Sequence, residues 1–178
     1  MCRFVLMNLM KRFCLSVVFL FWVLSLSAQT ATPSTSILVT GKVKKEKTFS
    51  LADIRALKIR ELGNLNTSCS PRRKEESKNV KAVLLKELLD SVQFDAQSSR
   101  LLNQFYFKFV ATDGYTLVYS FNEIYNTETG NHLFIVVDKD GKPIEEIENR
   151  ILILTTSDLK QGARNMKHLE KIVVCQVE

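Results

Sequence analysis

The sequence predicts a mixed α+β domain in which short helices lie between short strands. Two Asp-Gly pairs, Asp113-Gly114 and Asp140-Gly141, each separate two hydrophobic stretches, and Asp-Gly is typical of tight hairpin turns. Most connections between the expected strands are too short for the crossover helices that parallel winding requires. We therefore expect a single mixed-sheet domain over residues 37–178, with short helices between the strands.

The first 28 residues predict an export signal of the Sec type. Lys11 and Arg12 precede an apolar run at 13–24, and small residues suited to cleavage follow at 25–28. The run is shorter than the roughly 20 apolar residues of a membrane span; a retained N-terminal anchor is the alternative. We expect a bacterial periplasmic or secreted protein without a stable membrane span after cleavage, and a flexible lead-in at 29–36.

The charge of the chain does not favour a nucleic-acid partner. Three of its 25 basic residues and none of its 19 acidic residues lie in the predicted signal, which leaves 22 bases against 19 acids, a net charge of +3. No basic stripe with interleaved aromatic residues is present. The sequence also has no P-loop and no G-x-S-x-G motif, so it predicts neither of those enzyme classes and no catalytic residue.

Two cysteines, Cys69 and Cys175, remain after the predicted signal is removed. An oxidising periplasm would permit a disulfide between them, but the sequence does not show whether they lie close enough to pair. They have no C-x-x-C spacing, so they indicate neither a zinc site nor a thioredoxin motif.

The N-terminal third predicts a strand, a turn and a short helix. Residues 37–43 form a hydrophobic stretch interrupted by a glycine, and Lys44 to Lys47 is a charged turn. Ser50 is a good N-cap for a helix over 51–57, whose apolar residues recur with helical spacing.

The middle of the chain predicts one long helix after a polar segment. Residues 64–79 are rich in Ser, Asn and charge and are expected to be the least ordered. Residues 83–92 have apolar side chains near one helical face, and we expect a helix there. A weaker helical turn is expected over 99–104.

A strand with one buried aromatic face is expected at 105–111. Phe105, Phe107 and Phe109 alternate there with other residues, and successive side chains of a strand point to opposite faces. These three rings are expected in the core.

A hairpin and a capped helix follow. The Asp113-Gly114 turn leads into a strand at 115–119. Ser120 and Glu123 form a capping-box pattern for a short helix at 121–125.

The rest of the chain predicts three further strands. A loop is expected at 127–131, and the strands at 132–137, 151–155 and 172–177.

The segment 162–172 contains a possible anion site. Gly162-Ala163 leads into Arg164 and Lys167, three positions apart, which a helical turn would place on one face. Small residues allow a close approach of the backbone, and the arginine fork suits phosphate. A solvated basic turn before the last strand is the equally weighted alternative.

Four short motifs follow one another in the chain. They are Thr40-Gly41-Lys42-Val43 with residues 48–54, then residues 81–89, then Thr112-Asp113-Gly114-Tyr115 with residues 120–124, and finally the segment 162–172. Together and in this order they resemble the molybdopterin-binding domain of the sulfite oxidase type, and the resemblance covers nearly all of the chain after the signal.

The resemblance implies a molybdenum-molybdopterin cofactor and the corresponding chemistry. Cys69 would be the metal ligand, since molybdenum of this kind accepts a soft thiolate. Arg164, Lys167, Asn165 and His168 would contact the cofactor. The implied activity is an oxidoreductase that transfers an oxygen atom or two electrons, with a separate protein as its redox partner.

Several positions depart from the family pattern. Ala82 stands where the family has a glycine, His168 where it has a tryptophan, and Asn149-Arg150 where it has Pro-Leu-Arg; the run around Cys69 is also less regular. The flanks of Cys69 and the missing glycine at Ala82 favour an alternative from a different class of function: a cofactor-free periplasmic binding or interaction module that retains the fold and has lost the metal site.

Overall fold

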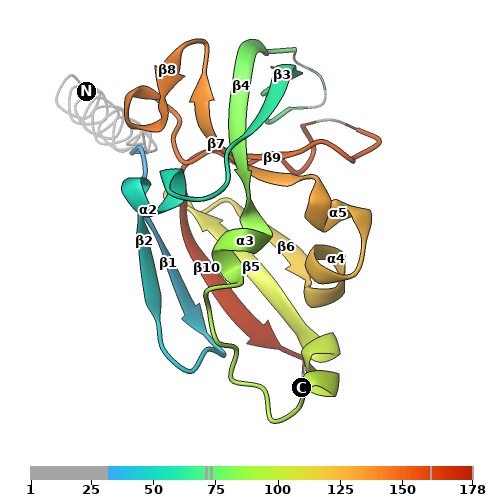
Figure 1. The fold of residues 1–178 in the computed structure, drawn as a ribbon. Helices are drawn as coiled ribbons and strands as arrows, with labels where there is room; N and C mark the ends of the chain where they lie inside the picture. The colour runs from blue at the N-terminus through green and yellow to red at the C-terminus, as the bar shows by residue number, and fades with distance from the viewer. Residues whose placement is uncertain (1–31, 71, 73, 161, 178) are drawn as a thin grey trace, which may run out of the picture. The chain divides into compact units, whose positions relative to one another are not determined.

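The strands of this chain pair into two sheets (Figure 1). The structure is a computed structural model and describes residues 32–177 except 71, 73 and 161. The predicted signal at 1–28 therefore lies outside the described residues. The α+β class is confirmed, but the strands divide between two sheets, where the sequence suggested one mixed sheet.

The first sheet brings the two ends of the domain together. Its strand order is β2-β1-β10-β5-β6. The strands are β1 (Ser36–Gly41), β2 (Lys47–Ser50), β5 (Phe105–Ala111), β6 (Thr116–Ser120) and β10 (Leu169–Gln176). β1 and β10 run parallel, while the other three pairs are antiparallel. The first sheet is thus mixed, and its only parallel pair joins the first and the last of the described strands.

The second sheet is antiparallel throughout and is built around β7. The strands are β3 (Arg60–Asn66), β4 (Glu76–Leu84), β7 (Leu133–Lys139), β8 (Lys142–Pro143) and β9 (Ile153–Thr155). The polar segment 64–79, expected to be the least ordered, begins in β3 and ends in β4. Its polar composition is compatible with strands because β3 is an edge strand with much exposed surface.

The prediction of a long helix over 83–92 is mostly wrong. β4 continues to Leu84, and the helix α3 covers only Leu85–Leu89. β4 lies between β3 and β7, and apolar side chains cover both of its faces: Val83 belongs to the main core, whereas Ala82 and Leu84 belong to a separate cluster. A strand buried on both faces reads as a continuous apolar run, which periodicity alone cannot distinguish from a buried helix.

The described helices are α2 (Leu51–Arg55), α3, α4 (Phe121–Tyr125) and α5 (Glu128–Asn131), with 3-10 turns η1 (Ser99–Gln104) and η2 (Ile144–Glu146). Two of them, α2 and α4, begin where their capping residues predict. Ser50 and Ser120 each form a capping box with the residue three positions on, Asp53 and Glu123. The helix α5 occupies the segment expected as a loop; the Thr127 hydroxyl caps it by accepting from the Thr129 amide at 3.2 Å.

The main core fills the space between the sheets. Phe105, Phe107 and Phe109 are almost completely buried, as the alternating pattern predicts, and they belong to one cluster with Leu133 and Ile135 of β7. α3 closes this core with three buried leucines. The described helices contain none long and apolar enough to cross a membrane.

Part of the expected lead-in contacts the domain. The Ser34 amide donates to the Arg150 carbonyl oxygen at 3.0 Å, and the Thr112 hydroxyl donates to the Thr32 carbonyl oxygen at 2.8 Å. Residues 32–35 are therefore held at the start of β1.

Truncating the central aromatic side chain of β5 will destabilise the domain strongly. Phe107→Ala should lower the free energy of unfolding in urea by about 3–5 kcal/mol, because a fully buried ring is replaced by a cavity. The control is Val118→Ala on neighbouring β6, where the side chain is 54% exposed and a change within about 0.5 kcal/mol is expected. Equal losses in the two variants would contradict the placement of Phe107.

Candidate functional site

The segment that carries the predicted phosphate contacts is an irregular connection, not a helical turn. Met166 forms an isolated antiparallel bridge with Ile153, and no helix occurs among the described residues between β9 and β10. The prediction that Arg164 and Lys167 lie one helical turn apart is therefore wrong. Residues 162–164 form a turn, and the bridge then joins Met166 to β9.

Gly162 lets this connection pass close to the segment that carries Cys69. Its φ is +87°, and a Cβ atom at this position would lie 2.7 Å from the Ser68 carbonyl oxygen. Only glycine avoids both the strained backbone and the clash. The sequence correctly indicated a close approach here, although the partner is the chain's own backbone.

Asn165 joins the same two segments from the inside. Its side chain is 2% exposed; the amide nitrogen donates to the Ser68 carbonyl oxygen at 2.8 Å, and the amide oxygen accepts from the Thr155 amide at 3.0 Å. The side chain that the resemblance assigns to the cofactor thus satisfies two buried backbone groups.

Arg164 is held by two carboxylates and an aromatic ring. Its Nε and Nη2 donate to Asp158 at 3.0 and 2.5 Å, and its Nη1 donates to Glu123 at 3.0 Å. Its guanidinium carbon lies 4.8 Å from the centroid of the Tyr119 ring. The bonds to Asp158 raise the pKa of Arg164 above its usual value, so the group stays charged and that charge is matched within the protein.

Tyr119 forms the floor beneath this ion pair. Its hydroxyl lies 3.0 Å from the Thr155 hydroxyl, and burial raises its pKa to about 12. The phenol is therefore protonated at neutral pH and acts as a neutral hydrogen-bonding group.

Lys167 and Cys69 do lie near each other. The Lys167 ammonium is 3.6 Å from Glu75, whose other oxygen is 3.3 Å from the Lys139 ammonium. Cys69 is an exposed residue, yet desolvation raises the pKa of its thiol, and the charge of Lys167 only partly opposes this. The thiol is mainly protonated at neutral pH, the less reactive form for metal binding.

The structure also bears on two further predictions, the role of His168 and the possible disulfide between Cys69 and Cys175. His168 has a positive φ of 58°, and its Nδ1 contacts the Arg150 carbonyl oxygen at 3.2 Å. Cys69 and Cys175 are both free thiols. The disulfide that the sequence left open is therefore not formed.

These residues do not offer a molybdopterin the contacts that it needs. Arg164 is already neutralised by two carboxylates, and Asn165 uses its donor and its acceptor within the fold. Asn165 lines only a small cavity of about 10 Å³, together with Thr155 and Thr156. Cofactor binding by Cys69 and its neighbours stays a prediction, and the arrangement around them does not fit the group.

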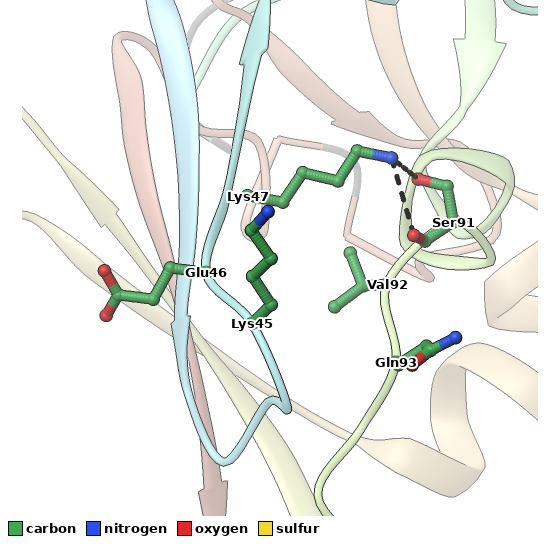
Figure 2. A pocket seen from close by; sticks show the side chains of 6 residues that line it. All are labelled: Lys45, Glu46, Lys47, Ser91, Val92 and Gln93. Atoms are coloured by element: carbon green, nitrogen blue, oxygen red, sulfur yellow. Dashed lines mark hydrogen bonds between the residues drawn. The ribbon is translucent and has the colours of Figure 1, made fainter.

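The larger described cavities lie elsewhere. One of about 410 Å³ and one of about 370 Å³ lie on the two sides of Gln93, next to the charged turn 44–47, and one of about 390 Å³ lies at the end of the second sheet. Figure 2 shows the first, with Lys45 and Lys47 among its lining residues. The sequence identified this turn only as charged and gave no sign of a cavity.

Sequence reasoning also missed the partners that decide what the predicted residues do. These are Asp158, Glu123, Tyr119, Ser68 and Glu75. Glu123 was identified as a capping residue, and one of its oxygens does accept from the Ser120 amide at 2.8 Å. Its second oxygen binds Arg164, which no local pattern indicates.

Comparison with protein-family models finds no match for this chain, and comparison with curated proteins finds none either. What the structure establishes is the class, a β-rich α+β domain with two sheets and short helices.

Removing the guanidinium of Arg164 will cost more stability than removing an exposed arginine. Arg164→Ala leaves Asp158, whose side chain is 11% exposed, without its partner; the expected loss is about 2–3 kcal/mol in urea unfolding. Arg55→Ala is the control, because its pair with Glu145 is half exposed and should contribute at most about 0.5 kcal/mol. Arg164→Lys should fall between the two, since an ammonium cannot form the fork. A loss for Arg164→Ala no larger than for Arg55→Ala would contradict the structural role.

The thiol of Cys69 will react more slowly than an unperturbed cysteine, with a midpoint shifted to higher pH. In a Cys175→Ser background, the rate of alkylation by iodoacetamide is measured against pH. Lys167→Ala should raise the midpoint further because it removes a stabilising positive charge, whereas Glu75→Gln should lower it because it removes a negative one. Midpoints that shift in the same direction in both variants would show that Lys167 and Glu75 do not act through their charges.

Proposed function

We propose that this chain is an exported, cofactor-free binding or interaction module that retains a fold of the sulfite-oxidase-type molybdopterin-binding domain. The proposal keeps the ancestry that the four motifs suggest and assigns the protein to a class other than the oxidoreductases. Its place of action would be the periplasm or the exterior of the cell, following the predicted signal.

One observation carries the proposal: the guanidinium of Arg164 already binds two of the protein's own carboxylates through three of its nitrogens. Five N–H donors are available to an arginine, and here the fork that suits phosphate is directed at Asp158 and Glu123. A phosphate would have to displace two negative groups that already lie at hydrogen-bonding distance. Arg164 therefore serves stability in the proposed module, where the family would use such a residue for the cofactor.

The surroundings of Asn165 and Cys69 support the same proposal. Asn165 is buried with both ends of its amide bonded, so turning it toward a ligand would leave the Thr155 amide and the Ser68 carbonyl without partners. Because the pKa of the Cys69 thiol is raised, forming the thiolate that binds a metal requires additional free energy.

Metal and pterin analysis tests the proposal. The full chain is produced in a bacterium that synthesises molybdopterin and is purified from the periplasm; a mass that begins at Gln29 confirms export and cleavage. We expect molybdenum near the background level and no pterin fluorescence after oxidation, because the cofactor-facing groups are occupied.

The control is a Cys69→Ser variant treated in the same way. Wild type and variant should give the same low reading if the module lacks the cofactor. Molybdenum close to one per chain in the wild type, lost in Cys69→Ser, would overturn the proposal and establish the oxidoreductase instead.

A further inference from the structure

The turn between β1 and β2 carries a concentration of positive charge. Four lysines occur within six residues, interrupted by one acid: Lys42, Lys44, Lys45 and Lys47, with Glu46. Glu46 accepts a hydrogen bond from the Thr40 hydroxyl and points away from the cavity (Figure 2). Within the described part of the chain, none of these four lysines forms an ion pair. The turn therefore presents a net positive surface.

The first cavity beside this turn is lined by two lysines and measures about 410 Å³. The Lys47 side chain crosses from its strand to Ser91, whereas the Lys45 side chain stays on the side of the strand (Figure 2). Lys47 is held in place: its Nζ donates to the Ser91 hydroxyl oxygen at 3.0 Å and lies 4.8 Å from the Phe49 ring centroid. The Lys45 side chain has no hydrogen bond with any described residue, so its ammonium group is available to a ligand that binds in the cavity.

The second cavity adds an apolar wall. It measures about 370 Å³ and is lined by Lys44, Gln93, Phe94, Ala96 and Leu102, with two serines. Gln93 lines both cavities, so they adjoin. A partner that extends across Gln93 would meet positive charge first and then an apolar surface.

Backbone contacts make this surface a defined one. The Lys44 amide donates to the Gln93 carbonyl oxygen at 2.9 Å, the Asp95 amide donates to the Lys42 carbonyl oxygen at 3.0 Å, and Val43 bridges to Phe94. The turn is thereby fixed to the segment that follows α3. A rigid surface loses less conformational entropy on binding than a mobile one.

We propose that these two cavities bind an extended acidic peptide segment of a protein partner, with carboxylates at Lys44, Lys45 and Lys47 and an apolar side chain against Phe94 and Leu102. The inference deepens the proposed function, since it names the partner chemistry of the binding module, and it rests on that function. Charge complementarity selects the acidic segment.

Shape favours a peptide over a small anion. Ligand pockets for small molecules enclose most of their ligand, whereas these two cavities are open and adjoin across Gln93. β2, which begins at Lys47, is the edge strand of its sheet, and sheet edges present backbone groups that an extended peptide can pair with. Rim charges of this kind contribute modestly and are screened by salt, so binding should weaken as ionic strength rises.

Fluorescence anisotropy with a defined probe tests the inference. The probe is a fluorescein-labelled, amidated peptide of sequence Glu-Glu-Leu-Glu-Glu-Phe. It is titrated at low salt with the exported protein, from which the predicted signal has been removed. Lys44→Ala/Lys45→Ala should weaken binding about tenfold, which corresponds to about 1.4 kcal/mol. Neither side chain has a hydrogen bond or ion pair with another described residue, so this variant should fold normally.

The matched control is Lys78→Ala/Lys142→Ala, which removes the same charge from two exposed lysines at the end of the second sheet. It should change the affinity by less than about twofold, the scale of a distant charge. A second probe, with serine in place of its leucine and phenylalanine, should bind the wild type at least tenfold more weakly, because it has no apolar side chain to bury against Phe94 and Leu102.

Three results would overturn the inference. They are no binding of the probe by the wild type, equal losses in the two double variants, and displacement of the probe by tripolyphosphate at the same concentration as by unlabelled peptide. The last would identify a small-anion site. Molybdenum measured on the same samples separates the two proposals, because metal in the protein overturns the cofactor-free function and leaves the peptide titration to stand or fall separately.

Discussion

The ion pair of Arg164 with Asp158 and Glu123 is the interaction around which the predicted site is organised. It connects the segment before β10 to the loop after β9 and to α4, and its planar group lies over the buried ring of Tyr119. Because Glu123 also caps α4 through its second oxygen, one carboxylate couples a helix start to the ion pair. Loss of the guanidinium would leave two partly buried charges uncompensated.

The residues expected to contact a cofactor already have partners within the protein. Arg164 binds Asp158, Asn165 binds the Ser68 carbonyl oxygen, and the Lys167 ammonium lies 3.6 Å from Glu75. A cofactor site needs donors that the fold leaves unpaired and a cavity in which they converge. Residue identity is necessary for such a site, and the direction in which each donor points decides whether it exists.

Unpaired charge and open volume coincide instead at the turn between β1 and β2. The lysines there form no ion pair with any described residue, and the adjoining cavities combine ammonium groups with apolar surface. The described domain therefore has two charged regions. Near Arg164 the charges pair with one another and stabilise the fold, whereas near Lys45 the positive charges face the solvent. In an interaction module the second region is the one expected to contact other molecules.

The sequence by itself determined the local elements. The helix N-cap at Ser50, the capping box at Ser120, the alternating phenylalanines of β5 and the Asp-Gly turns were all confirmed, because each depends on neighbours within a few positions. Tertiary structure alone decided that β4 extends through an apolar run resembling a helix, and that Asn165 binds a carbonyl 97 positions away. The physical reason is that burial on both faces of a strand, and the pairing of a charged or amide group, are set by segments distant in the chain. No local pattern of residues records them.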